Sequence, residues 1–414
     1  MRVKTLAALT IGLVSTLSIG AAHPALAASG GLDATFGNGG KVLTNLGSNS
    51  GGEQIEAVPN NAVLQSNGDI VVSGNFGLVR YLPSGKVDTS FGTGGLVQTA
   101  QTVAGLAVEP NGDYLAVGAG ATASGIRGFT VTRFTSAGRL DPTFGTGGVV
   151  TTVFPNASDG AGADTVLVLP NGDILVGGQA SVPGTSYHAP VVTEGALALY
   201  TPSGTLDTAF GSGGIVQSTA SIGDITDLGT DAAGDIFVLP ARAEFSPTGQ
   251  LDTSVTPAAI TASSRGGDDA FLSTGQSVAA TSVGVSRGNT AVQATMFNAN
   301  GGVDPAFSNP PFTYTGAKFA GHESPGAIAV APNGQVVIAG SHFEGSSVFG
   351  LARLDANGSL DSGFGKAGVL TTSFQGDDGA TIVLIQPNGA IVAIGFSEDN
   401  STGVTDLALA RYLG

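Results

Sequence analysis

The residues Leu140-Asp141-Pro142-Thr143-Phe144-Gly145-Thr146-Gly147-Gly148-Val149-Val150-Thr151 are the most regular copy of a phrase that returns along the whole chain. Its pattern is Leu/Val-Asp-x-x-Phe-Gly-x-x-Gly-x-Val/Leu-x-Thr. Neighbouring copies lie 45 to 66 residues apart, with their aspartates at Asp33, Asp88, Asp141, Asp207, Asp252, Asp304 and Asp361. Seven copies of one unit predict a repeat architecture rather than one continuous core.

Each unit has the pattern of four short strands, as the segment 327–372 illustrates. An apolar run at 327–330 ends at Pro332-Asn333-Gly334, a strong hairpin turn, and a β-branched run at 335–340 follows. A polar loop at 341–347 leads to an alternating run at 349–354. The tight turn Asn357-Gly358 then opens the phrase, which ends in a fourth run at 368–372. We name these expected strands a, b, c and d.

The same order of runs and turns recurs through the chain, and it excludes a helical fold. The apolar runs are four to seven residues long and glycine interrupts them, which is not the pattern of amphipathic helices. Four-stranded antiparallel units of this length are typical of propeller blades, and seven is within the usual number. The sequence therefore predicts an all-β, seven-bladed β-propeller.

The two ends of the sequence complete one unit between them. The run at 407–414 is a c strand with no d strand after it, whereas 31–44 holds a phrase with no a, b or c strand before it. We expect the N-terminal strand to be the outermost strand of the seventh blade, which would close the ring. The unit at 241–260 departs most from the pattern, because Val255 replaces the phenylalanine and the Gly-Gly pair is missing.

The combination of motifs resembles the delta-60 repeat family of bacterial β-propellers. The motifs are the Leu-Asp-x-x-Phe-Gly phrase, Pro170-Asn171-Gly172 with the apolar run after it, and Leu409-Ala410-Arg411-Tyr412. The resemblance covers the chain beyond its first residues. It implies an exported propeller and carries over no catalytic residues.

Residues 1–27 have the features of a cleaved secretory signal peptide. Arg2 and Lys4 precede an apolar stretch, and Ala25-Leu26-Ala27 is a small-x-small cleavage site. We expect residues 28–414 to form a single propeller domain that is secreted to the extracellular space. The chain has no cysteine, so neither a disulfide nor a thiolate zinc site stabilises it.

The charge balance narrows the range of partners. The chain has 15 Lys and Arg against 31 Asp and Glu, a net charge of -16, which opposes nucleic acid and anionic membranes as partners. No stretch after the signal peptide is long and apolar enough to span a membrane. We expect a monomer whose partner is an extracellular protein or polysaccharide.

The repeated residues of the phrase are predicted to be structural. The aspartate is followed by Pro, Thr or Ala, a pattern that favours a capped turn in which the carboxylate accepts a backbone N–H. The phenylalanine is expected to lie buried between neighbouring blades.

Functional residues are expected among those that do not repeat. The d–a and b–c loops share one face of a propeller and carry the length variation, including the loop 179–193. The candidates on this face are Glu53, Asp159, Asp164, Tyr187, His188, Asp268, Asp269, His322, Glu323, Asp377 and Asp378. Further acids in the same loops are Glu56, Asp224 and Asp227. These acids are expected to be solvated residues of the entry loops, and the alternative is a ring of carboxylates near the channel that holds Ca²⁺ or receives a cationic ligand.

These observations predict a secreted, non-catalytic binding or scaffold propeller that acts through its acidic loop face. The alternative is a carbohydrate-active hydrolase or lyase that uses carboxylates of the same face. His188, His322 and His342 are expected in loops, without the spacing of a zinc motif, and no Gly-x-Ser-x-Gly elbow is present. The absence of tryptophan, a common sugar-stacking residue, weighs against a lectin or glycosidase.

Overall fold

The computed structural model describes most of the chain after residue 28. The described residues are 29–48, 52–155, 157, 160–183, 191–218, 222–231, 233–252, 269–272, 275–285, 288–307, 310–316, 321–343 and 345–414. The predicted signal peptide at 1–27 lies outside them, as do Asp159, Tyr187, His188 and Asp268. Within these ranges the regular secondary structure is entirely β-strand.

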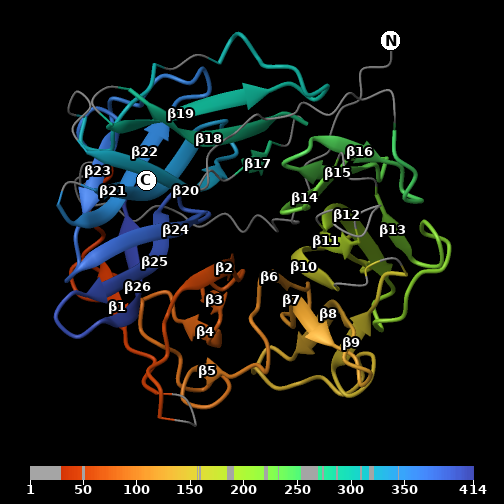
Figure 1. Cartoon of the computed structure of the whole chain (residues 1–414). Coiled ribbons are helices and arrows are strands. Elements are labelled where there is room, and N and C mark those ends of the chain that lie inside the picture. The colour runs from red at the N-terminus through yellow and green to blue at the C-terminus, as the bar shows by residue number, and fades with distance from the viewer. Residues whose placement is uncertain are drawn as a thin grey trace, which may run out of the picture. The chain divides into compact units, whose positions relative to one another are not determined.

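The strands form seven antiparallel sheets in the order of a seven-bladed β-propeller, and we number the sheets as blades 1 to 7 (Figure 1). Two compact units are distinguished: unit 1 comprises Met1–Val42, Ser264–Ile394 and Ala408–Gly414, and unit 2 comprises Leu43–Ser263 and Gly395–Leu407. The prediction of one domain over 28–414 stays a prediction.

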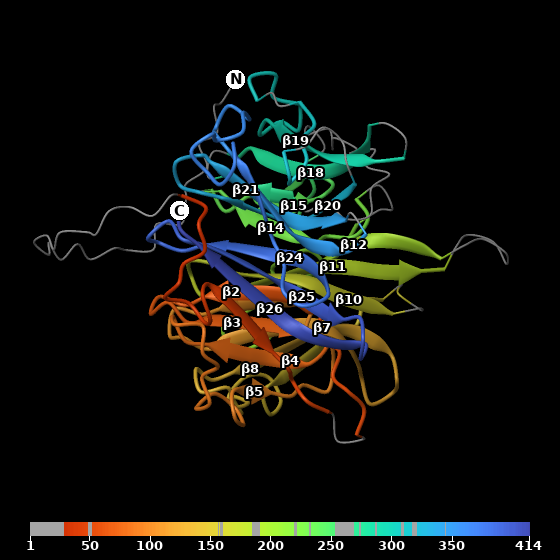
Figure 2. The same ribbon diagram turned by 90° about the vertical axis from the view of Figure 1, so that its left-hand side faces the viewer.

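Unit 2 contains blades 1 to 4, whose strands pair in chain order. Blade 1 consists of β2 (Pro59–Leu64), β3 (Ile70–Gly74), β4 (Gly77–Tyr81) and β5 (Leu96–Val97), and blade 2 of β6 (Gly105–Val108), β7 (Tyr114–Ala121), β8 (Arg127–Phe134) and β9 (Val149–Thr152). Blade 3 consists of β10 (Ala161–Val168), β11 (Ile174–Val182), β12 (Val192–Tyr200) and β13 (Ile215–Gln217), and blade 4 of β14 (Asp227–Thr230), β15 (Ile236–Leu239) and β16 (Ala243–Phe245). Figure 2 shows β10, β11 and β12 side by side.

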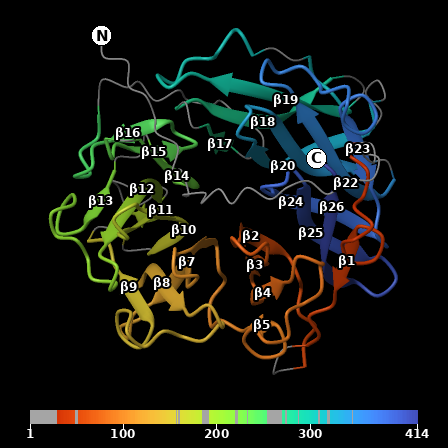
Figure 3. The ribbon, with the colours of Figure 1, turned by 180° about the vertical axis from the view of Figure 1, so that it is seen from behind.

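Unit 1 contains blades 5 and 6. Blade 5 consists of β17 (Asp269–Phe271), β18 (Ser277–Gly284) and β19 (Thr290–Phe297). Blade 6 consists of β20 (His322–Val330), β21 (Val336–Phe343), β22 (Ser347–Leu354) and β23 (Val369–Thr372). The neighbouring strands β18 and β19 are seen from both sides in Figures 1 and 3.

Blade 7 combines the two ends of the chain. Its sheet has the order β1 (Lys41–Thr44), β26 (Val404–Tyr412), β25 (Ile391–Asp399), β24 (Asp377–Ile385). Within unit 1, Gly30 N–H donates to the carbonyl of Leu413 over 2.7 Å, and Asp33 N–H donates to the carbonyl of Arg411 over 2.8 Å. The N-terminal strand is therefore the outermost strand of blade 7, whereas closure of the ring stays a prediction.

The prediction of four strands per blade is confirmed in five sheets, and blades 4 and 5 show three strands within the described residues. In blade 4 the expected fourth strand falls in the segment 253–268, which lies outside them. In blade 5 the fourth position is taken by a single bridge between Phe312 and Val292. Pro310 and Pro311 precede Phe312, and a proline has no N–H to donate to a ladder.

The aspartate of the phrase holds a turn and an arginine, as blade 2 shows. Asp141 Oδ1 accepts the backbone N–H of Thr143 over 2.9 Å, and its Oδ2 accepts Arg133 Nε over 2.8 Å. The Arg133 guanidinium in turn lies 4.7 Å from the centre of the Phe144 ring, a cation–π arrangement. The same three contacts recur at Asp33, Arg411 and Phe36, at Asp88, Arg80 and Phe91, and at Asp361, Arg353 and Phe364.

The phenylalanine of the phrase is buried between neighbouring blades, as predicted. Phe144 is fully buried in the outer part of blade 2. A Cβ added to Gly204, in the c–d turn of blade 3, would lie 2.8 Å from Phe144 Cε2. Gly204 also has a φ of 84°, a conformation that glycine adopts without strain. The turn and the ring are therefore fitted to each other.

Candidate functional site

The acidic residues predicted for the d–a loops lie mostly in the first residues of the inner strands. Asp164 belongs to β10, Asp269 to β17, and Asp377 and Asp378 to β24. The prediction that His322 and His342 lie in loops is wrong, since they belong to β20 and β21. These strands continue past the apolar runs because their backbones stay paired while their side chains become polar, which the apolar pattern cannot reveal.

Several of the candidates have ordinary structural surroundings. Glu53 and His322 are exposed, and Asp269 is half-buried in β17. Asp377 Oδ1 accepts the backbone N–H of Ser347 over 2.9 Å, and Asp378 Oδ2 accepts the backbone N–H of Phe374 over 2.7 Å. Asp377 therefore bonds the backbone at the start of β22, and Asp378 the backbone just before its own strand.

Glu323 and His342 form a buried cross-strand pair in blade 6. They are directly opposite each other in the β20–β21 register, and Glu323 Oε1 lies 2.8 Å from His342 Nδ1. Burial raises the pKa of Glu323 above its ordinary value, while the hydrogen bond and charge of His342 oppose this rise. The register and the burial together favour a structural role, in which the pair joins the ends of two strands.

Asp164 and Asp224 form a different kind of pair. Asp164 lies in β10 beside a break in the register between Ala163 and Thr165, and Asp224 lies in the loop before β14. Their carboxyl groups are within hydrogen-bonding reach of each other. One oxygen of each carboxyl group, Asp164 Oδ2 and Asp224 Oδ1, is buried without a hydrogen-bond partner among the described residues. Blades 3 and 4 of unit 2 thus bring together two carboxyl groups that are 60 residues apart in the sequence.

The surroundings of this pair favour one shared proton. Burial, and then repulsion by the charge of Asp224, raise the pKa of Asp164 from 3.8 to about 7. Burial also raises the pKa of Asp224, and its hydrogen bond with Asp164 opposes that rise. Among the described residues, no basic side chain is one of the groups that shift either pKa. Two carboxyl groups in contact cannot both ionise cheaply, so near neutral pH the pair holds about one proton.

No metal centre is formed by the part of the chain that the structure describes. Within it, no group of three or more His, Cys, Asp or Glu side chains is placed to hold a metal ion. Asp159 and Asp268, which the Ca²⁺ prediction includes, lie outside that part. Binding of Ca²⁺ to the acidic face therefore stays a prediction.

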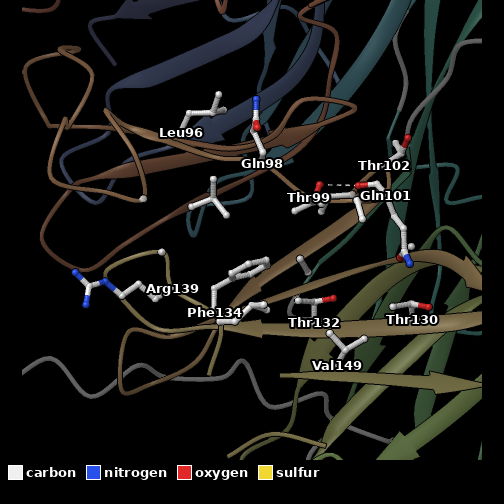
Figure 4. Close-up of a pocket in the computed structure, with 18 of the residues that line it drawn as sticks. Leu96, Gln98, Thr99, Gln101, Thr102, Thr130, Thr132, Phe134, Arg139 and Val149 are labelled. Carbon is white, nitrogen blue, oxygen red and sulfur yellow. Dashed lines mark hydrogen bonds between the residues drawn. The ribbon is translucent and has the colours of Figure 1, made fainter. Parts of the chain in front are cut away.

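A cavity of about 840 Å³ lies between blades 1 and 2. Its walls come from β5, the segment 98–103 that follows it, β7, β8 and the turn 138–140, and we call it the blade 1–2 pocket. Figure 4 shows Gln98, Gln101, Thr130 and Thr132 around it, with Arg139 to one side. Apolar side chains such as Val97, Val117 and Phe134 complete the lining, so the pocket is mostly neutral.

Sequence reasoning missed the pocket and the role of Asp224 in a pair. One sequence feature could have indicated the pocket: Gln101 stands at the position where the copies in blades 2 and 6 have Phe154 and Phe374. The position of His342 in a strand could also have been predicted, because the alternation of side chains in β21 continues through Gly340 to His342 on the same side of the strand. No sequence feature indicated that Asp164 and Asp224 lie close together, since their proximity depends on the packing of two blades.

Two segments of the chain match a known sequence family. Residues 65–91 and 331–364 match the profile of a β-propeller domain of unknown function, DUF5122. No protein of curated function matches the chain significantly by sequence. Among the described residues, no helix is long and apolar enough to cross a membrane.

Solved structures with a similar fold are remote in sequence. The extracellular domain of a one-component system from B. thetaiotaomicron is 11% identical with a TM-score of 0.43, and the match covers 89% of this chain and 40% of that one. A protein of unknown function from Dyadobacter fermentans is 12% identical with a TM-score of 0.43 (90% and 99% covered). A gluconolactonase from Xanthomonas campestris is 13% identical with a TM-score of 0.36 (86% of each chain covered).

These identities and scores are too low to transfer a function. The chain spans 40% of the length of the first of these proteins. The matched segments and the seven sheets together identify a β-propeller built from sequence repeats, and the finer assignment to the delta-60 repeat family stays a prediction.

Proposed function

We propose that the chain is a secreted, non-catalytic binding propeller that receives a cationic group at its acidic face, with Asp164 and Asp224 at the centre of the site. The observation that carries this proposal is the pair of buried oxygens, Asp164 Oδ2 and Asp224 Oδ1, which have no partner among the described residues. Buried polar oxygens are costly unless something bonds them, and an ammonium, a guanidinium or Ca²⁺ would do so.

Charge supports a cation rather than an anion as the ligand. A buried pair that shares one proton becomes fully ionised when a cation arrives, because the cation removes the repulsion between the two carboxylates. The net charge of -16 also attracts cations from a distance. The site would therefore exchange one proton for one positive charge.

A second candidate is acid–base hydrolysis by the same two carboxyl groups. A protonated and an ionised carboxyl in contact can activate a water molecule, as the shared proton of aspartic protease dyads illustrates. Glycosidase chemistry fits less well, since it requires carboxyl groups roughly 5 to 9 Å apart. Binding is preferred because a cation that replaces the shared proton would bond both Asp164 Oδ2 and Asp224 Oδ1.

The experiment is calorimetric titration of the secreted protein with spermidine and, separately, with CaCl₂ at fixed ionic strength. Since the pKa of Asp164 is raised to about 7, cation affinity should increase from about pH 6 to about pH 8 and binding should release a proton. Asp164→Asn should abolish both effects. Asp173→Asn is the matched control, because Asp173 lies in the β10–β11 turn of the same blade, bonded to Asn171.

Binding that is insensitive to pH, or equal in the Asp164→Asn variant and the parent, would reject this site. The hydrolytic alternative predicts a different result. Turnover of peptide or ester substrates that is lost in both Asp164→Asn and Asp224→Asn would favour catalysis over simple binding.

A further inference from the structure

At the blade 1–2 pocket, several residues that pack against each other at the equivalent positions between other blades are replaced. Equivalent positions follow from the aligned ends of the c strands, where Tyr200 ends β12 and Phe134 ends β8. Tyr200 donates its hydroxyl to Thr152 Oγ1 of blade 2 over 2.8 Å, and Tyr81 and Tyr412 bond Thr44 and Thr372 in the same way. In blade 2 the equivalent residue is Phe134, which has no hydroxyl. Thr99, the residue of blade 1 at the position of Thr152, instead donates its hydroxyl to the carbonyl of Gln101 over 2.6 Å.

The aromatic ring that follows the outer strand is also missing here. Phe154 lies two residues after Thr152, contacts Phe129 with ring centres 4.7 Å apart, and is 3% exposed. Phe374 follows Thr372 in the same way and contacts Phe349 at 5.0 Å. The residue two positions after Thr99 is Gln101, which lines the pocket. An amide therefore occupies the position of a ring.

The facing wall has changed from alanine to threonine. Ala196 and Ala198 of β12 belong to the same buried apolar cluster as Phe154 and Tyr200. The residues of β8 at the same distances from the strand end are Thr130 and Thr132, and both line the pocket. Between blades 2 and 3 this space is apolar core, whereas between blades 1 and 2 it is a cavity with hydroxyl and amide groups on apolar walls.

We propose that the blade 1–2 pocket binds a small neutral aromatic molecule that carries a hydroxyl or amide group. Its ring would replace the aromatic packing that Phe154 provides at the next interface, and its polar group would bond Gln101 and the threonines of β8. The volume of about 840 Å³ lies within the usual range of small-molecule sites. No carboxylate is among the lining residues and Arg139, at an exposed turn, is the one charged residue among them, which disfavours a cationic ligand.

The polar groups suit such a ligand because they lie close to one another in the lining of the pocket. Thr130 is 2% exposed, and its hydroxyl lies 3.2 Å from that of Thr151, so one of its bonds is already made. The amide of Gln101 extends over Gly120 beside Thr130 Oγ1. A hydroxyl or amide of the ligand would add donors and acceptors to these groups, while an unsubstituted ring would leave them without partners.

The test uses 4-hydroxybenzamide as the probe, with cyclohexanol and tyramine as a non-aromatic and a cationic comparison. The full secreted protein should bind 4-hydroxybenzamide saturably, with a Kd of about 1 mM or tighter, and bind the other two at least about tenfold more weakly. Binding should raise the melting temperature by an amount that grows with concentration.

Gln101→Phe restores the residue that blades 2 and 6 have at this position. This variant should melt at a higher temperature than the parent and bind the probe at least about tenfold more weakly, since its ring takes the position that the ring of the ligand would occupy. The matched control is Gln250→Phe, which alters an exposed glutamine of a turn in blade 4 and should leave binding unchanged.

The double variant Thr130→Ala and Thr132→Ala restores the alanines of β12 and keeps the pocket open. It should bind the probe several-fold more weakly, and it decides the question if Gln101→Phe does not fold. The proposal is overturned if no probe shows saturable binding. It is equally overturned if a folded Gln101→Phe variant, or the double threonine variant, binds 4-hydroxybenzamide as the parent does.

Discussion

Aspartate residues play two opposite parts in this chain, and their surroundings decide which. The pKa of Asp141 is held below its ordinary value by hydrogen bonds from the side chain and backbone of Thr143, with Arg133 adding to them. The pKa of Asp164 is raised to about 7 by burial and by Asp224. Ionised Asp141 therefore stabilises the folded state, whereas ionised Asp164 destabilises it.

At the residue scale this contrast predicts how Asp164→Asn changes stability with pH. The folded-state pKa of Asp164 lies above its unfolded value of 3.8, so its contribution is fully present below about pH 4 and is lost as the pH rises through about 7. Asparagine does not ionise. The variant should therefore match the parent at about pH 4 and exceed its free energy of unfolding by roughly 1 to 3 kcal/mol at about pH 8.

Urea denaturation at the two pH values measures this difference. Asp141→Asn is the control, and its effect on the free energy of unfolding should have the opposite sign. It removes a carboxylate that the folded state stabilises, so it should destabilise the protein at about pH 8. A variant at Asp164 that is equally destabilised at both pH values would contradict the burial argument.

At the scale of the element, the d strand of blade 2 and its phrase join blade 2 to blade 3. The aspartate caps a turn, the arginine of the c strand lies over the phenylalanine ring, and the ring meets the glycine turn of the following blade. One short phrase thus supplies a turn, an ion pair and an inter-blade contact. Blade 1 keeps this contact, between Phe91 and Gly138 of blade 2, but the residues after its phrase depart from the repeat at Gln101, which lines a pocket.

Phe144→Ala tests this account of the phrase. Phe144 is fully buried, so the substitution should lower the free energy of unfolding by about 3 to 5 kcal/mol. Phe343 is 42% exposed at the end of β21, and Phe343→Ala should cost less than about 1 kcal/mol. Chemical denaturation compares the two variants, and similar losses in both would show that the inter-blade ring is not the stabilising contact.

At the scale of the whole molecule, residues from both ends of the chain meet in blade 7. Besides the backbone bonds of Gly30 and Asp33, Arg411 lies 2.9 Å from Asp33 Oδ2, and its guanidinium lies 4.6 Å from the centre of the Phe36 ring. The terminal blade therefore repeats the contacts that other blades make within one continuous segment.

Deletion of residues 405–414 tests how much these contacts contribute. The deletion removes most of β26 and exposes the edges of β1 and β25, so the melting temperature should fall markedly. The charge-conserving Arg411→Lys variant, which keeps the strand but loses the forked contact with Asp33, should show a much smaller loss. Unchanged thermal unfolding after the deletion would contradict the role assigned to blade 7.

The sequence by itself determined the repeat number, the strand order, the turns and the buried phenylalanines, because these depend on periodicity and on local turn chemistry. It also showed that the chain ends complement each other. It did not locate Asp164 beside Asp224, the buried Glu323–His342 pair, or the blade 1–2 pocket. Those features arise where residues far apart in the sequence pack together, and burial, pKa shifts and cavities depend on the distances that only the tertiary structure provides.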